Sequence, residues 1–190
     1  MNETSIQPQA VALSRDKQVA PQGIGMAVAF DWGLAVQMLL TPILPLFLGT
    51  PASTSKSNTN PLSNPILSFV AYWLIALLFI LFGEGIRSGV RWTRPVQIVG
   101  NALGFLGGFV VLIQLWKDIQ TGNYWGLAPA IILLIFSPLI AWRLSRPQTA
   151  QWFATVSRAE GRRRHGGIWI FWIALWAVVG GTLVAVGSFH

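Results

Sequence analysis

The feature that most constrains this chain is a series of five apolar segments, each about as long as a bilayer is thick. A membrane-crossing helix needs about 20 mainly apolar residues, and polar segments separate the five runs. We expect spans at about residues 24–48, 66–86, 96–116, 124–142 and 168–187. The expected fold class is therefore an all-α integral membrane protein, built as a bundle of five transmembrane helices.

Composition agrees with a membrane location. Hydrophobic residues make up 53% of the chain and charged residues 10%, whereas a soluble domain carries about 25% charged residues. We expect residues 1–22, which are polar and contain two prolines, to be a disordered cytoplasmic tail. Residues 23–190 then form a single transmembrane helical domain. The chain has no cysteine, which excludes disulfides and thiolate metal sites.

The first span is the weakest of the five. It contains Asp31 and Gln37, and Pro42 and Pro45 interrupt its outer third. Each proline removes a backbone donor from the helix, and an acid within a membrane segment is costly and marks a functional candidate. The alternative topology is four spans plus a re-entrant first segment.

The distribution of lysine and arginine indicates an orientation. Eleven of the thirteen basic residues lie in the N-terminal tail, the loop after the second span and the loop after the fourth. Cytoplasmic loops carry the Lys/Arg excess in membrane proteins. We therefore expect a cytoplasmic N-terminus and a C-terminus on the opposite side, in a bacterial-type plasma membrane or internal membrane.

A polar cluster is predicted near the cytoplasmic ends of the first two spans. Glu84, Arg87 and Arg91 are spaced i, i+3 and i+7, which places them on one helix face. Asp31 lies at a similar depth, and an ion pair from Asp31 to Arg87 or Arg91 would join the two spans. The alternative is that both arginines extend to lipid headgroups.

Glycines spaced by four residues mark a contact face on the third span. Gly100, Gly104 and Gly108 form two overlapping GxxxG units, and Asn101 lies beside them. Small residues let membrane helices approach closely, and asparagine seeks an interhelical hydrogen bond. Internal helix packing is the favoured interpretation. A self-association seam or the lining of an oligomeric pore is the alternative.

The basic connection before the fifth span resembles an interfacial helix. It combines Trp152 with a run of three arginines, Arg162, Arg163 and Arg164, and Trp169 follows at the start of the span. Basic amphipathic segments beside a span usually lie on anionic lipid. We therefore predict a lipid-facing surface here, with docking of an acidic partner as the alternative. Two further tryptophans continue the stripe from Trp169, and aromatic stripes are more typical of ordinary packing than of a ligand site.

Catalytic signatures are absent from the sequence. Both histidines, His165 and His190, lie outside the spans, so no histidine pair exists to hold a b-type haem. There is no HExxH, GxSxG or Walker A motif. We expect no cofactor, no metal and no nucleic-acid partner, and we disfavour catalysis.

The sequence favours a non-catalytic accessory or scaffold subunit of a membrane assembly. Its partners would be the lipid bilayer and either other membrane subunits or a second copy of the chain. The alternative is a small transporter or oligomeric channel with a polar path involving the first span, because interrupted helices and intramembrane polar groups often mark substrate paths.

Overall fold

The computed structural model describes residues 21, 23–48 and 65–187, and every regular element in these ranges is a helix. The predicted disordered tail lies outside the described residues, apart from position 21. The elements follow the chain in this order: α2 (Ile24–Leu40), α3 (Leu44–Leu48), α4 (Pro65–Arg87), α5 (Thr93–Gln120), α6 (Leu127–Ile131), the π-helix η2 (Ile132–Phe136), α7 (Ser137–Ser145), α8 (Pro147–Thr155), α9 (Arg158–Arg164) and α10 (Ile168–Gly187).

Four helical stretches are long and apolar enough to cross a membrane. They cover Ile66–Arg87, Thr93–Gln120, Leu127–Ser145 and Ile168–Val186. The described residues are thus all-helical, consistent with a helical membrane protein, and the four stretches overlap four of the predicted spans. The expected first span is a shorter apolar helix, α2, of 17 residues. It ends at Leu40 because Pro42 has no N–H to continue the ladder, and a turn separates it from α3.

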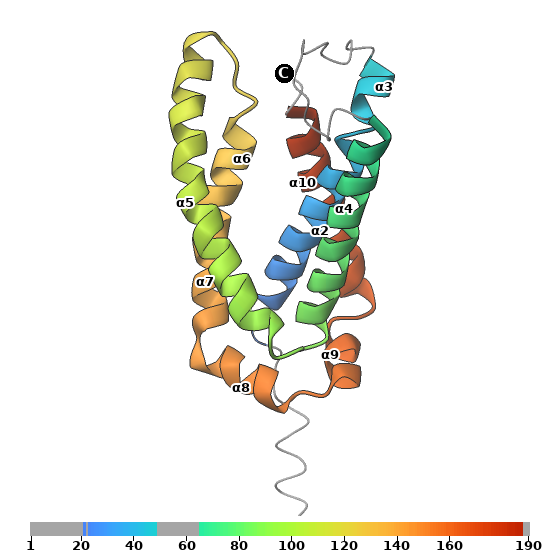
Figure 1. Ribbon diagram of the computed structural model, residues 1–190. Helices are drawn as coiled ribbons and strands as arrows, with labels where there is room; N and C mark the ends of the chain where they lie inside the picture. The colour runs from blue at the N-terminus through green and yellow to red at the C-terminus, as the bar shows by residue number, and fades with distance from the viewer. Residues whose placement is uncertain (1–20, 22, 49–64, 188–190) are drawn as a thin grey trace, which may run out of the picture.

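The long helices form two units that lie side by side (Figure 1). In the first unit, α2 lies between α4 and α10 and packs against both. In the second unit, α5 packs along α6, η2 and α7. The two units come together at the end of the molecule that carries α8 and α9, and they are separated toward the other end (Figure 1).

Very close helix crossings hold the first unit together. A Cβ atom at Gly181 of α10 would meet the backbone carbonyl oxygen of Gly33 and would lie 2.7 Å from the Val36 Cβ. On the opposite side of α2, a Cβ atom at Gly83 of α4 would lie 2.8 Å from the indole ring of Trp32. Glycine at these contacts lets the backbones approach and gain dispersion contacts that lipid does not supply.

The π-helical turn of the second unit ends two residues before Pro138. Pro138 carries no N–H and so cannot donate to the carbonyl of residue 134. The ladder widens over Ile132–Phe136, before the α-helical pattern resumes at Ser137. Single π-turns of this kind occur mostly within longer helices.

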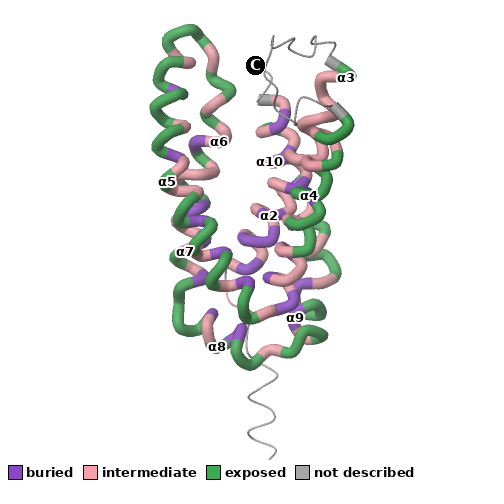
Figure 2. The backbone as a smooth tube through the Cα atoms, in the orientation of Figure 1, coloured by how far each residue is buried: buried purple, intermediate pink, exposed green. Residues whose placement is uncertain are grey.

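The buried core lies where the two units meet. It combines residues of α2, α4, α7, α8 and α10, namely Ile24, Ala27, Val28, Ile86, Ile140, Leu144, Trp152, Phe153 and Ile173. Buried positions gather in this region, whereas the outer faces of α4 and α5 are largely exposed (Figure 2).

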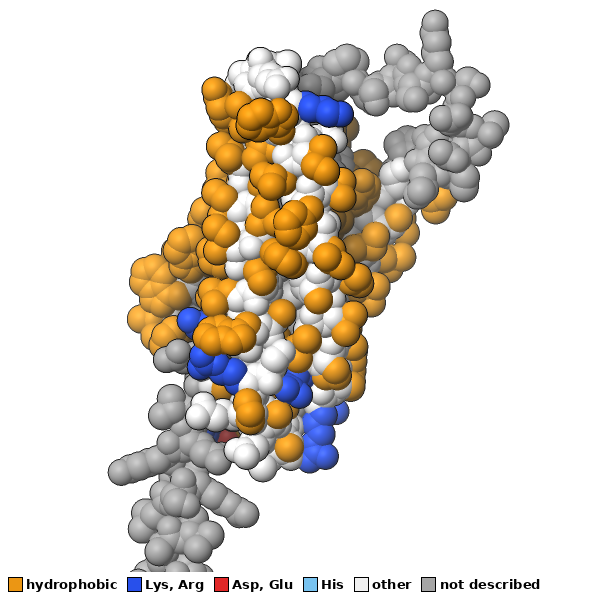
Figure 3. Space-filling model, turned by 90° about the vertical axis from the view of Figure 1, so that its left-hand side faces the viewer, with side chains coloured by type: hydrophobic (Ala, Val, Ile, Leu, Met, Phe, Trp, Pro, Cys, Tyr) orange, Lys and Arg blue, Asp and Glu red, His pale blue; other side chains and the backbone are white. Residues whose placement is uncertain are grey.

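Charge is concentrated at the same end. Nine of the ten described lysine and arginine residues lie between Arg87 and Arg94 or between Arg143 and Arg164. These segments lie at the end of the molecule that carries α8 and α9 (Figure 1). Lys117, in contrast, lies in the last turn of α5. Hydrophobic side chains cover the surface between the two ends on the face shown in Figure 3.

Candidate functional site

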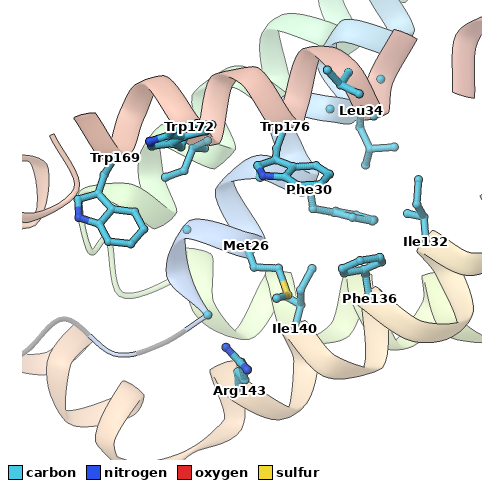
Figure 4. A pocket seen from close by; sticks show the side chains of 18 of the residues that line it. Met26, Phe30, Leu34, Ile132, Phe136, Ile140, Arg143, Trp169, Trp172 and Trp176 are labelled. Carbon is cyan, nitrogen blue, oxygen red and sulfur yellow. The ribbon is translucent and has the colours of Figure 1, made fainter. Parts of the chain in front are cut away.

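A large groove runs between the two helical units. Its volume is about 1710 Å³, which exceeds the range of about 300–1,000 Å³ typical of small-molecule pockets. One wall is formed by α2 and α10, and the other by α6, η2 and α7. The side chains of the two walls face one another in Figure 4.

Apolar and aromatic side chains dominate both walls. Figure 4 labels Met26, Phe30 and Leu34 on α2 and Ile132, Phe136 and Ile140 on the facing wall, and each of them lines the groove. The tryptophan stripe of α10 lies along the same groove, and its rings are strongly exposed, to 64% at Trp169, 50% at Trp172 and 69% at Trp176.

The base of the groove is positively charged. Arg143, Arg163 and Arg164 line it together with Glu160 and His165. Glu160 accepts hydrogen bonds from Arg163 and from Arg164, and these bonds hold the pKa of its carboxyl below the usual range. Burial lowers the pKa of His165, as do the nearby Arg87 and Arg164, and this favours its neutral form. Three arginines and one glutamate give this end a net charge of +2.

The predicted polar cluster does not assemble as expected. Glu84 pairs with Arg87 at 2.6 Å, and its second partner is Arg162 of α9 at 2.9 Å. Arg91 donates to the backbone carbonyl of Ala154. Asp31 belongs to neither contact, so the hypothesis of an Asp31–Arg87 or Asp31–Arg91 ion pair is wrong. The contacts of Glu84 and Arg91 run instead to α9 and α8, through Arg162 and the Ala154 carbonyl.

The partner of Asp31 is a glutamine. Gln97 of α5 donates a hydrogen bond of 2.8 Å to Asp31 Oδ1, and both side chains are buried. Asn101, one turn further along α5, donates to the Gln97 carbonyl. Three buried oxygens of this region, Asp31 Oδ2, Asn101 Oδ1 and Ser137 Oγ, have no hydrogen-bond partner among the described residues.

The predicted glycine face of α5 is divided between two environments. Cβ atoms at Gly104 and Gly108 would meet side chains of η2 and α7, at 3.4 Å from Ser137 Oγ and 2.8 Å from Leu134 Cδ2 respectively. A Cβ atom at Gly100 would meet nothing within 4 Å. Two of the three glycines therefore lie at an internal helix contact, and the third faces outward.

The predicted lipid-facing surface is also divided. Trp169 is exposed, as are Arg162 and Arg163. Trp152, in contrast, is only 4% exposed. Its ring lies edge-on to Phe153 and His165. The expectation that Trp152 lies on lipid is wrong, because α8 folds under the helical units and places this ring in the core.

Sequence reasoning missed the groove and the position of Arg143. The available signal was that Met26, Phe30 and Leu34 recur at helical spacing beside the glycines of the first span. A pattern of this kind shows that a face makes contacts, but not which helix it faces. Within residues 23–48 and 65–187, no group of three or more His, Cys, Asp or Glu side chains could hold a metal ion.

Comparison with known proteins gives no independent guide to function. No protein-family model, curated protein or solved structure matches the chain.

Proposed function

We propose that this chain is a non-catalytic accessory or scaffold subunit of a membrane assembly, and that the groove receives a transmembrane helix of a partner subunit. The observation that carries the proposal is the size and apolar lining of the groove. The lining extends along the second unit from Ala128 to Arg143, about 22 Å at a helical rise of 1.5 Å per residue. That length covers most of a hydrocarbon core about 30 Å thick.

The walls have the composition of a helix-binding surface. The part of α2 in the groove includes Gly25, Ala29 and Gly33, and small residues of this kind allow a helix backbone to approach. Exposed aromatic rings stand on either side, on α10 and on η2. Aromatic residues are enriched at the centres of protein interfaces. A helix laid in the groove would bury them together.

Photo-crosslinking in native membranes tests this proposal. The photoreactive residue p-benzoylphenylalanine replaces Phe136 or Trp176 in the groove, or Leu78 on the outer face of α4 as the matched control. All three positions are exposed, with Leu78 at 65%. We expect one discrete protein adduct from the groove positions and none from Leu78. Equal adducts at all three positions, or lipid adducts alone in the groove, would contradict a partner helix.

We further propose five crossings with the N-terminus in the cytoplasm. Nine of the ten described basic residues gather at one end of the helices, which the positive-inside rule assigns to the cytoplasm. The sequence has no native cysteine, so a single introduced cysteine is the only thiol that a labelling reagent can modify. With a membrane-impermeant thiol reagent, Thr121→Cys is expected to react in intact cells and Ser5→Cys only after permeabilisation. Reaction of both in intact cells would establish the four-span topology.

The second candidate is a small transporter or channel. The buried Asp31–Gln97 hydrogen bond, with a free carboxylate oxygen beside it, favours this function, since intramembrane acids often mark ion paths. Flux of protons or small cations through liposomes containing the purified chain is the test. Flux that disappears in Asp31→Asn, with folding retained, would support transport. Liposomes with no flux above the protein-free background would exclude this path.

A further inference from the structure

The groove changes character along its length. Near Trp176 and Phe136 its lining is apolar, whereas at the α9 end it includes Arg143, Arg163 and Arg164. An apolar surface that ends in positive charge matches a ligand with a hydrocarbon part and an anionic head. A purely apolar helix uses only the first part of this surface, so the basic end requires its own explanation.

Arg143 is the groove arginine that best fits an anion-binding role. Its side chain lies over the start of α2, where a Cβ atom at Gly23 would be 2.8 Å from the Arg143 Cβ. Gly23 has a φ of 112°, a conformation that favours glycine. Arg143 is only partly exposed and stands beside Ile140 at the end of the groove (Figure 4). Its guanidinium donates no hydrogen bond to any described residue.

Partial burial with no acceptor among the described residues is unfavourable for a guanidinium, which carries five N–H donors. Arginine binds phosphate through two parallel hydrogen bonds, and this geometry is favourable where water is scarce. The other two arginines share Glu160 as an ion-pair partner. That trio keeps a net charge of +1, and Arg143 adds a second positive charge to this end of the groove.

We propose that the basic end of the groove binds the phosphate of an anionic phospholipid, whose acyl chains lie along the apolar wall near Met26, Ile140 and Trp172. This inference goes beyond the proposed function, because it concerns the basic end of the groove and requires no partner subunit. A membrane lipid is favoured over a free anion because the charge and the apolar wall belong to one continuous groove. It is favoured over an acidic peptide because the apolar and aromatic lining beside the arginines suits acyl chains.

The expected contribution of one arginine can be stated. A basic residue near an anionic membrane surface contributes about 1 kcal/mol, which corresponds to about a fivefold change in affinity. Arg143→Gln is therefore expected to weaken binding about fivefold. Arg143→Lys keeps the charge and is expected to retain part of the affinity. Arg158→Gln is the matched control, because Arg158 lies on α9, is exposed and does not line the groove.

The experiment is a native mass spectrometry titration of the full purified chain in a non-ionic detergent. The probes are phosphatidylglycerol and phosphatidylcholine with identical acyl chains, and glycerol phosphate added as a soluble competitor. We expect phosphatidylglycerol to bind more tightly than phosphatidylcholine, Arg143→Gln to reduce that preference about fivefold, and Arg158→Gln to leave it within twofold of the wild type. Glycerol phosphate is expected not to compete, because it lacks the acyl chains.

Three results would overturn the proposal. Equal binding of the two lipids would show that the site does not recognise an anionic headgroup. Equal losses in Arg143→Gln and Arg158→Gln would indicate general surface charge. Full competition by glycerol phosphate would assign the site to a free anion. Melting temperatures of both variants, measured in parallel, identify any loss caused by unfolding. Because no partner is present, these outcomes are independent of the crosslinking result.

Discussion

The contact between α2 and α10 allows a sharp test of how the first unit is held together. Gly180 and Gly181 are adjacent glycines on the same helix, yet their surroundings differ completely. A Cβ atom at Gly181 would meet the Gly33 carbonyl oxygen and the Val36 side chain, whereas one at Gly180 would meet nothing within 4 Å. Gly181→Ala therefore places a methyl group in the contact between α10 and α2, whereas Gly180→Ala places the same group in open space.

The magnitude follows from two opposing effects. Replacing glycine by alanine in a helix interior gains about 1 kcal/mol of helix propensity, and both variants share this gain. Overpacking a tight contact costs about 1–3 kcal/mol. At Gly181 the upper end applies, because the obstacle includes backbone, which no change of side-chain rotamer relieves. The expected net effect is a loss of about 2 kcal/mol for Gly181→Ala and a small gain for Gly180→Ala.

The assay is thermal unfolding of the purified chain in detergent, followed by circular dichroism and by the monodisperse fraction on size exclusion. For a chain of this size, 1 kcal/mol corresponds to about 2–4 °C. Gly181→Ala is thus expected to melt about 4–8 °C below the wild type, and Gly180→Ala at or above it. If the two variants melt at the same temperature, the close α2–α10 crossing does not stabilise the protein as we argue.

Three further predictions concern buried groups. Asp31→Leu leaves the Gln97 amide without its acceptor, so it should destabilise the fold by about 1–3 kcal/mol; Asp31→Asn, which keeps an acceptor oxygen, should cost less in the same melting assay. Trp152→Ala empties part of the core and should cost about 3–5 kcal/mol, whereas Trp176→Ala, at a ring that is 69% exposed, should leave the melting temperature nearly unchanged. Burial lowers the pKa of His165 below its ordinary value of 6.5, so the unfolded chain binds the proton more tightly and stability falls as the pH drops below about 6.5. The wild type should therefore melt at a lower temperature at pH 5.5 than at pH 7.5, and His165→Phe should show a smaller difference; an identical pH dependence would contradict the assignment.

The helical class was predictable because it rests on local properties. Long apolar runs require helices in a bilayer, where every backbone group must be bonded internally. The expected span at 168–187 and the observed α10 (Ile168–Gly187) illustrate how well composition defines such a helix. The first span was less predictable, because its prolines divide it into α2 and α3 and leave 17 residues in the longer part.

The contacts between helices were less accessible to sequence reasoning. Asp31 was expected to pair with an arginine, because an oppositely charged side chain is the partner that a sequence suggests for a buried acid. Its actual partner, Gln97, is an uncharged residue whose position depends on how α5 enters the bundle. Trp152 was expected on lipid because it belongs to a basic amphipathic segment beside a span. Its burial depends on the fold of α8 beneath the helical units, which local composition does not encode.

The position of α2 between α4 and α10 has a consequence for biosynthesis. A chain made from its N-terminus presents α2 and α4 early, so the contact of Trp32 with Gly83 can form while later helices are still absent. The opposite face of α2, with Gly33, stays unpaired until α10 has been made. The second unit, in contrast, is built from helices that follow one another directly. The newly synthesised chain therefore carries an incomplete first unit through most of its production, with the α10-binding face of α2 exposed until synthesis is nearly finished.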